Sequence, residues 1–161
     1  MEKFSVKKLY KDFSKLENQE ITIEEWVKNL RDSKTFGFIE LNDGTFFKNI
    51  QIVISDKLSN FKEVAKLLIY STIKATGTLV VTENAKQPFE IQATNVEILS
   101  ECGRDYPLQN KKHTMEYLRT IAHLRPRANT FQAVFRIRSV AAFVSFLAIF
   151  FIFLAAQISH V

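Results

Sequence analysis

The sequence predicts a mainly β fold: a small barrel of five strands with one intervening helix, followed by a C-terminal helical segment. Three observations carry this prediction. Residues 20–54 and two stretches between 71 and 99 alternate apolar and polar side chains, as strands with one buried face do. Residues 59–69 switch to a helical period. From Gln132 to about Ala156 the pattern is helical without a break, and its second half carries no charge.

The first three strands are expected within residues 20–54. In the first strand, Ile21, Ile23 and Trp26 are expected to pack inward. Asn42-Asp43-Gly44 is a hairpin turn signal because Asn and Gly tolerate positive φ. The third strand is expected over 45–54, where adjacent Phe46 and Phe47 must place one ring on each face.

The second strand is predicted to have one face that is not wholly buried. Phe36, Phe38 and Glu40 share that face, and the opposite face carries Gly37, Ile39 and Leu41. A carboxylate between apolar positions favours solvent, so the two phenylalanines beside it are candidates for an exposed binding surface.

A helix and two further strands complete the predicted barrel. Ser59 is expected to cap the helix, whose apolar face consists of Phe61, Val64, Ala65, Leu68 and Ile69. A slip of phase near Asn95 predicts a β-bulge in the last strand. Three strands, a helix and two strands is the order of the OB-fold, a five-stranded Greek-key barrel, although other small barrels remain open on order alone.

We expect four parts along the chain. Residues 1–17 form an N-terminal arm with a short amphipathic helix as one alternative, and 18–101 form the barrel domain. Residues 102–138 are a basic linker, interrupted by a helix that Pro126 ends, and 139–161 are an apolar C-terminal helix.

The net charge of +5 is concentrated in one band. Residues 104–138 hold eight Lys and Arg against Asp105 and Glu116, whereas 1–103 are nearly balanced. Such a band favours a polyanion or an anionic membrane, and a solvated face is the alternative. The single cysteine, Cys102, excludes an intrachain disulfide and fits a cytoplasmic location; the N-terminus has no signal-peptide pattern.

Two stretches resemble one family. "RDYPLQNKKHTMEYLRTIAHLRPRANTFQAVFRIRS" is similar to the segment that joins the anticodon-binding and catalytic domains of asparaginyl-tRNA synthetases. "WVKNLRDSKTFGFIELNDGTFFKNIQIV" resembles the first three strands of that family's N-terminal OB-fold. The resemblance covers roughly residues 20–139, and it implies an OB-fold that binds the anticodon loop of tRNA-Asn.

The resemblance implies three nucleic-acid-binding residues: Arg31 of "LRDS", Phe38 before "IEL", and Gln51 of "NIQIV". Their chemistry suits an unpaired loop base, because an aromatic ring stacks on its face and an amide can donate and accept at its edge. Arg31 would hold a phosphate or an edge acceptor. The alternatives are a core role for Phe38 and an ordinary exposed strand position for Gln51.

One position departs from the family's pattern. Glu25 stands directly before Trp26, where the family has glycine. A carboxylate near a strand that faces RNA would repel phosphate, so the approach of RNA at this point is in doubt.

Catalytic residues are not expected in this chain. A synthetase of this family uses ATP and Mg²⁺, which require a glycine-rich strand near the nucleotide and paired carboxylates. No glycine follows Gly103 and no Asp or Glu follows Glu116. We therefore expect no cofactor and no metal, and surface or packing roles for His113, His123 and His160.

The residues from Val140 to Ile158 meet the criterion for a membrane-spanning helix, with Ser145 and Gln157 as the only polar side chains. The arginines on its N-terminal side would leave the barrel in the cytoplasm as a tail-anchored protein. Two alternatives are a helix that forms a homodimer interface and a truncation or frameshift product with an unnatural tail.

Three functions follow as hypotheses. The first is a tRNA anticodon-binding OB-fold module without catalysis of its own. The second is a tail-anchored membrane adaptor whose barrel binds a protein. The third is a fragment of an active asparagine-tRNA ligase that another chain completes.

Overall fold

The computed structural model describes residues 4–82, 85, 87–108 and 111–158, of which 152–158 are described by their backbone alone. The chain divides into two compact units, residues 1–110 and 111–161.

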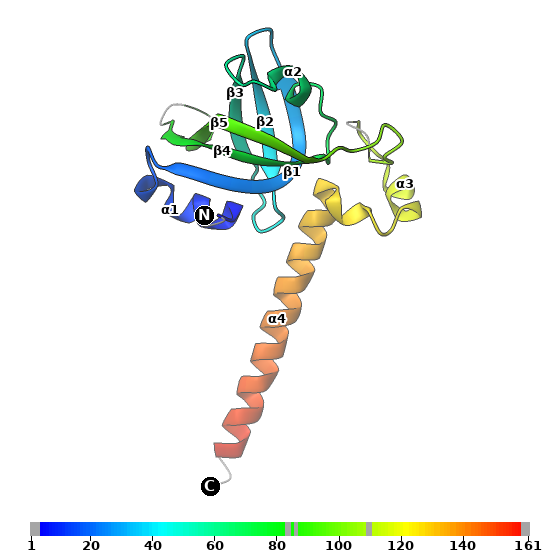
Figure 1. Cartoon of the computed structure of the whole chain (residues 1–161). Coiled ribbons are helices and arrows are strands. Elements are labelled where there is room, and N and C mark those ends of the chain that lie inside the picture. The colour runs from blue at the N-terminus through cyan, green and yellow to red at the C-terminus, as the bar shows by residue number, and fades with distance from the viewer. Residues whose placement is uncertain (1–3, 83–84, 86, 109–110, 159–161) are drawn as a thin grey trace. The chain divides into compact units, whose positions relative to one another are not determined.

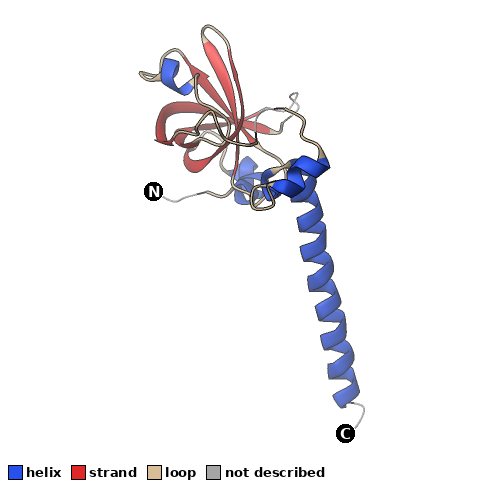
Figure 2. Cartoon of the chain, turned by 90° about the vertical axis from the view of Figure 1, so that its right-hand side faces the viewer, coloured by secondary structure: helices blue, strands red, loops and turns tan. Residues whose placement is uncertain are grey.

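The first unit is built on a closed five-stranded barrel (Figures 1 and 2). The strands are β1 (Glu20–Asp32), β2 (Phe36–Asn42), β3 (Ile50–Ser55), β4 (Thr72–Val81) and β5 (Phe89–Ser100). Their order around the barrel is β1-β2-β3-β5-β4. All neighbours are antiparallel except β3 and β5, which are parallel and pair Ile52 with Ile91. The predicted OB-fold barrel is therefore confirmed.

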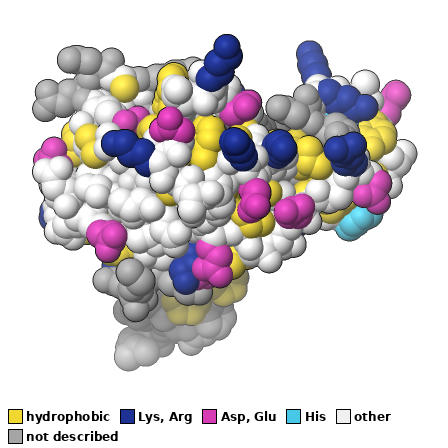
Figure 3. Space-filling model, turned by 45° about the horizontal axis from the view of Figure 1, so that its top comes forward, with side chains coloured by type: hydrophobic (Ala, Val, Ile, Leu, Met, Phe, Trp, Pro, Cys, Tyr) yellow, Lys and Arg dark blue, Asp and Glu magenta, His cyan; other side chains and the backbone are white. Residues whose placement is uncertain are grey.

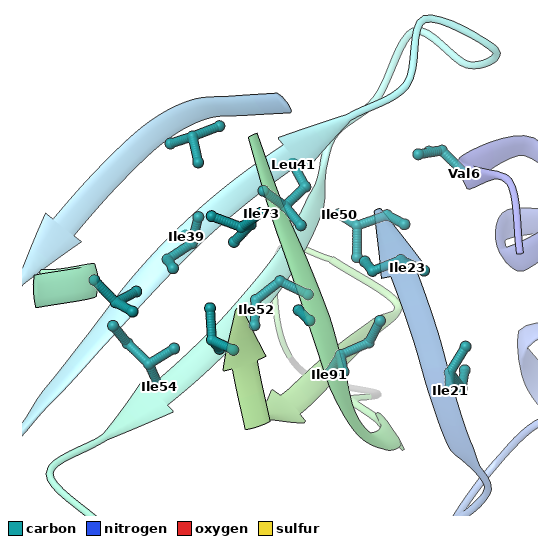
Figure 4. Packing of buried hydrophobic residues seen from close by; sticks show 14 of the residues in the cluster. Val6, Ile21, Ile23, Ile39, Leu41, Ile50, Ile52, Ile54, Ile73 and Ile91 are labelled. Atoms are coloured by element: carbon teal, nitrogen blue, oxygen red, sulfur yellow. The ribbon is translucent and has the colours of Figure 1, made fainter. Parts of the chain in front are cut away.

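Alternation of side chains fills the barrel with branched aliphatic residues (Figure 4). The buried set includes Ile39, Leu41, Ile50, Ile52, Ile54, Ile73, Leu79 and Ile91. The prediction that Trp26 packs inward is wrong, because the side chain is 42% exposed. Ile21 and Ile23 set a phase that turns Glu25 and Val27 inward, so Trp26 must point outward.

Three register shifts interrupt the regular pairing, and one of them lies at the start of β4, between Thr72 and Ile73. In β1 the register with β2 shifts between Val27 and Asn29. Between β4 and β5, Thr76 pairs with Asn95, and the next residue, Gly77, pairs with Ala93. Thr94 is therefore the extra residue of β5. The predicted bulge near Asn95 is confirmed.

The connection between β2 and β3 is longer than the sequence suggests. Gly44 has the positive φ of a turn residue, +77°, but β3 begins only at Ile50. The Asn42 side chain, which is buried, explains the longer loop. Its amide nitrogen donates to the carbonyl oxygens of Phe46 and Lys48, and its oxygen accepts from the Gly44 N–H at 2.7 Å.

The N-terminal arm contains helix α1 (Val6–Asp12) and a 3₁₀ turn η1 (Phe13–Lys15). Ser5 caps α1, and Val6 and Leu9 are fully buried in the core. The Tyr10 hydroxyl donates to the Asn49 carbonyl at 2.7 Å. The arm is thus an integral part of the barrel and lies at the opposite end from α2 (Figures 1 and 2).

The helix between β3 and β4 is shorter than predicted. Helix α2 spans Phe61–Val64, and its N-cap position is Asn60 without a side-chain hydrogen bond, so the expected Ser59 cap is wrong. Val64 and Leu67 pack into the core whereas Leu68 is exposed. A single helical turn followed by a loop places Leu67, three residues after Val64, over the barrel end.

The second unit is helical. It contains α3 (Met115–Thr120), capped by the Thr114 side chain, a 3₁₀ turn η2 (Arg125–Arg127) that includes Pro126, and α4 (Asn129–Ile158). The Arg125 guanidinium lies over the rings of Phe131 and Phe135 at 5.0 and 5.8 Å, which holds η2 against the first turns of α4. The uninterrupted C-terminal helix predicted from residue 132 is confirmed.

Candidate nucleic-acid interface

The outer surface of β1, β2 and β3 brings the three predicted residues onto adjacent strands. Arg31 and Phe38 are directly paired across β1 and β2. Gln51 pairs with Glu40, which stands two residues after Phe38 on the same face of β2. Arg31 is exposed, while Phe38 and Gln51 are half-buried. Each of the three therefore faces outward.

The bulge in β1 decides where Arg31 points. Odd-numbered residues from Ile21 to Val27 point into the barrel. Without an extra residue at Lys28 the same alternation would turn Arg31 inward. After the bulge, Leu30 pairs with buried Ile39 and packs against the core, and Arg31 pairs with outward-facing Phe38.

Two aromatic rings stand together on this face. Phe36 meets Phe38 edge to face, with ring centroids 5.5 Å apart and planes at 78°. Phe36 is 45% exposed. The expected common face of Phe36, Phe38 and Glu40 is confirmed, and it offers an aromatic surface on which an unpaired base can stack.

Glu40 organises the polar groups around these rings. One carboxylate oxygen accepts from the Arg31 guanidinium at 3.2 Å and from the Asn29 amide at 3.3 Å. The other oxygen accepts from the Asn49 amide at 2.9 Å. A guanidinium has five N–H donors, so this bond orients Arg31 and leaves it donors for a ligand.

The Gln51 amide is also held on both sides. Its nitrogen donates to a Glu90 carboxylate oxygen at 3.4 Å, and its oxygen accepts from the Gln87 amide at 3.4 Å. The Gln87 side-chain oxygen is buried and has no hydrogen-bond partner within the described part of the chain. Both bonds are long, which leaves the Gln51 amide able to exchange them for a base edge.

An open groove of about 690 Å³ lies next to these residues. Arg31, Glu40, Asn49, Gln51, Gln87 and Glu90 line it, together with Phe47. Phe38 does not line the groove but stands beside it. The volume of the groove falls within the range of roughly 300–1,000 Å³ that is typical of ligand sites.

Phe47 fulfils the expectation for the adjacent phenylalanines. Its ring is 55% exposed and lines the groove, whereas Phe46 packs on Tyr10 with centroids 4.7 Å apart. Both residues belong to the β2–β3 connection, so the division arises from the loop held by Asn42 and not from strand alternation.

Glu25, the departure from the family's pattern, is not on this surface. The residue is only 8% exposed and points inward. Burial, with smaller contributions from the negative charges of Asp43 and Glu24, raises the pKa of the Glu25 carboxyl to about 8. The carboxyl is therefore mostly neutral near pH 7, and the expected repulsion of phosphate by Glu25 does not arise at the outward face.

Charges of both signs are interspersed on the molecular face in Figure 3. In the candidate site the carboxylates of Glu40 and Glu90 stand next to Arg31 and Gln51. Within the described ranges, no group of three His, Cys, Asp or Glu side chains could hold a metal ion. The site thus suits base stacking and edge recognition better than the capture of many phosphates.

Other side chains raised by the sequence have packing roles or lie elsewhere. The His113 ring stacks on Tyr117 with centroids 5.2 Å apart, and His123 is exposed. His160 lies outside the described residues. The Cys102 N–H donates to the Ser71 hydroxyl at 3.0 Å.

Sequence reasoning misses Gln87 and Glu90 as neighbours of Gln51. The pattern before β5 indicates only a strand break at Pro88. The parallel pairing of β3 with β5 brings these residues to the site across 36 and 39 positions of sequence. No local pattern signals that juxtaposition.

Comparison with known families matches residues 21–99 to the model described as OB-fold nucleic acid binding domain. The barrel has the OB fold of this family. This range runs from the second residue of β1 nearly to the end of β5, so the family's core and the five strands coincide.

Curated relatives extend the likeness of this OB-fold domain beyond the barrel. Asparagine–tRNA ligase of Bacillus cereus is 58% identical over 143 residues, which is 89% of this chain and 31% of the relative. The asparagine–tRNA ligase of Alkaliphilus metalliredigens is 59% identical over 143 residues, again 89% of this chain and 31% of the relative. The resemblance to asparaginyl-tRNA synthetases is confirmed, and the chain spans about a third of the length of these relatives.

Solved structures agree with the fold. Asparaginyl-tRNA synthetase of Entamoeba histolytica is 26% identical, with a TM-score of 0.66, and the match covers 80% of this chain and 32% of that one. The enzyme of Pyrococcus horikoshii, 18% identical, matches with a TM-score of 0.70 over 86% of this chain and 32% of its own. The latter likeness concerns the fold alone.

Proposed function

We propose that the OB-fold domain binds the anticodon loop of a tRNA and that this tRNA is tRNA-Asn. The observation that carries the proposal is the arrangement of Arg31, Phe38 and Gln51 on adjacent strands of one outward face. The names of the similar ligases support the choice of RNA.

Each of the three side chains has a distinct role in this proposal. Phe38, braced by Phe36, stacks on a splayed base. Gln51 donates to and accepts from the base edge after it releases Glu90 and Gln87. Arg31, oriented by Glu40, contacts a phosphate or an edge acceptor. Stacking on an aromatic platform contributes roughly 1–3 kcal/mol per base.

Titration of tRNA-Asn in a filter-binding assay tests the proposal. Phe38→Ala is expected to weaken binding by about 1–3 kcal/mol, a factor of roughly 5 to 150. Leu99→Ala is the matched control because Leu99 is an exposed apolar residue of β5. Its affinity should stay at the wild-type value.

Two results would contradict the assignment. Equal affinity of wild-type protein and Phe38→Ala would remove Phe38 from the interface. Equal affinity for tRNA-Asn and for tRNA with a different anticodon would show that the face does not read anticodon bases. A Gln51→Leu variant separates these cases, since it should reduce discrimination between anticodons more than it reduces total affinity.

We propose asparagine ligation for this chain only where another chain supplies the catalytic residues that this chain lacks. The sequence after Glu116 holds no carboxylate for Mg²⁺, and the sequence after Gly103 holds no glycine to pass close to ATP. The side chains present therefore do not fit ATP and Mg²⁺. Addition of a separately produced class II catalytic domain, followed by an assay of asparaginyl-tRNA, tests the complemented-fragment alternative.

We also propose that residues 140–158 contact a membrane. One observation favours this: Asn129–Phe151 is long and apolar enough to cross a bilayer, and none of its most apolar stretch is buried. The exposed side chains include Phe143, Val144 and Ile149, which point to different sides of the helix at 100° per residue. Two such helices paired in water would still expose apolar outer faces, so lipid is a better partner than a second copy.

Alkaline extraction tests membrane contact. Full-length protein synthesised in the presence of phosphatidylcholine vesicles should stay with the lipid after carbonate treatment, as a spanning helix does. Replacement of Phe146 and Ile149 by Asp should abolish this retention, because charges at a helix centre oppose insertion by about 2.5–3.5 kcal/mol each. Release of the wild-type protein as a dimer in the supernatant would instead support the homodimer.

A further inference from the structure

We infer that Phe47 provides a second stacking site, which binds an unpaired nucleotide next to the one that Gln51 recognises. The inference rests on the proposed binding of an anticodon loop, and it adds a contact beyond the three residues named there. OB-folds that bind single-stranded nucleic acid contact roughly 4–16 nucleotides each, so one base on Phe38 does not account for the whole surface.

The loop between β2 and β3 holds Phe47 in place. The buried Asn42 amide nitrogen donates to the carbonyl oxygens of Phe46 and Lys48, the residues on either side of this ring. Phe46 packs on the Tyr10 ring, and the Tyr10 hydroxyl donates to a carbonyl oxygen two residues after Phe47, at 2.7 Å. A ring whose backbone is already fixed loses little further freedom on binding, which favours affinity.

The Phe47 ring is available to a ligand. It is 55% exposed and lines the groove of about 690 Å³. Within the residues that the structure describes, no other aromatic ring stacks on it. Ala85 and Pro88, from the connection before β5, add apolar surface to the same groove. A single exposed apolar side chain is common on protein surfaces, but this one stands in a groove and on a fixed loop.

Strand geometry separates this ring from Phe38. Glu40, two residues after Phe38 on β2, pairs with Gln51. The loop that carries Phe47 starts after Asn42, four residues and about 13 Å along β2 from Phe38. A base sandwiched between two rings holds them only about 7–8 Å apart, at roughly 3.5–4.0 Å for each contact. The two rings therefore contact different nucleotides, and the Gln51 amide lies between them along the strands.

Charge on this side of the groove favours a nucleotide over a protein. The Lys48 ammonium group lies 5.9 Å from the centre of the Tyr10 ring, and both side chains line the groove with Phe47. This ammonium group can neutralise the phosphate of the nucleotide that stacks. The carboxylates of the groove stand beside Gln51, where they would repel phosphate, so Lys48 is the expected phosphate contact.

Binding of the anticodon stem–loop of tRNA-Asn to the full-length protein tests the inference. Fluorescence anisotropy measures the affinity for the intact stem–loop and for stem–loops in which one unpaired base at a time has been removed. Phe47→Ala should weaken binding of the intact stem–loop by roughly 5- to 150-fold, and Phe47→Trp should retain the wild-type affinity. Leu99→Ala, which truncates an exposed apolar side chain of β5, is the matched control and should change nothing.

Removal of single bases identifies the nucleotide that each ring contacts. In Phe47→Ala, removal of the base that stacks on Phe47 in the wild type should have no further effect on affinity. In Phe38→Ala, removal of a different base should have no further effect. The losses caused by the two substitutions should multiply in the double variant, since contacts with different nucleotides are independent.

The outcomes distinguish failure of this inference from failure of the proposed function. Unchanged affinity of Phe47→Ala, or the same base identified in both single variants, would overturn the second stacking site and leave anticodon binding standing. Absence of binding between the wild type and the stem–loop would overturn the proposed function and this inference with it. Urea unfolding compares the stability of Phe47→Ala with that of the wild type. If Phe47→Ala is less stable, Phe47→Leu, which keeps apolar bulk without a ring, replaces it in every measurement.

Discussion

At the scale of single residues, carboxylates in this domain act in two different ways. Glu40 lies on the outward face, where it accepts hydrogen bonds from Arg31 and two amides and orients them. Glu25 lies inside, where burial raises its pKa to about 8. The difference arises from the phase of two strands, because one carboxyl is turned to solvent and the other to the core.

Glu25 makes the stability of the barrel depend on pH. Its folded-state pKa of about 8 lies above the ordinary value of 4.5, so the folded state binds the proton more tightly. The free energy of unfolding is therefore highest below about pH 4.5 with respect to this group, and falls as pH rises from there through about 8.

Glu25→Gln should remove this dependence. We expect the variant to match the wild type near pH 4.5 and to be more stable by roughly 1–3 kcal/mol near pH 8. Partial solvent screening keeps this difference below the full effect of the raised pKa on the free energy of unfolding. Urea unfolding at both pH values measures the difference, with Glu63→Gln as the exposed control. If the difference in the free energy of unfolding between variant and wild type does not change with pH, the pKa of Glu25 is not raised in the folded state.

At the scale of elements, bulges shape the barrel more than its regular ladders do. The bulge at Lys28 turns Arg31 to the surface. The bulge at Thr94 brings the backbone of β5 close to β4. A side chain built on Gly77 would place its Cβ 2.2 Å from the Gln92 carbonyl oxygen and 2.8 Å from the Ala93 Cα.

Gly77→Ala should therefore destabilise the domain by about 3 kcal/mol or more, because backbone atoms cannot move away as a flexible side chain can. Gly44→Ala is the matched control. Its Cβ would meet nothing within 4 Å, and only the positive φ of +77° opposes it, at about 1–2 kcal/mol. Urea unfolding of both variants compares the two costs, and similar values would mean that β4 and β5 are not so close.

At the scale of the whole molecule, charge and hydrophobicity are separated along the chain. The barrel residues are nearly balanced in charge, residues 104–138 are basic, and 140–158 are apolar. In the proposed function the barrel face reads bases, while the basic band attracts phosphate without regard to sequence.

This separation predicts the salt dependence of tRNA binding. Lys111→Gln/Lys112→Gln should reduce the slope of log affinity against log salt by about 0.7 for each phosphate that the variant no longer neutralises, with little change in discrimination between anticodons. Lys57→Gln/Lys62→Gln removes the same charge from the barrel domain and should leave the slope unchanged. An unchanged slope in the first variant would show that Lys111 and Lys112 do not contact phosphates of the tRNA.

Local patterns are sufficient for the order and kind of the elements. The alternation of Phe36, Phe38 and Glu40, the phase slip near Asn95 and the unbroken apolar helix are all encoded within a few neighbouring residues. The helical period over 59–69 predicts too long a helix, because one turn of α2 already closes the barrel end. Trp26 misleads because the phase of β1 outweighs the preference of a large ring for the interior.

The sequence by itself determined an OB-fold order, a face with exposed aromatic rings and an apolar tail, since each depends on the spacing of nearby side chains. Only the tertiary structure decided that Arg31 points outward, that Gln51 meets Gln87 and Glu90, and that Glu25 is buried. These features depend on which strands pair and in what register, and contacts across 39 positions leave no trace in local periodicity.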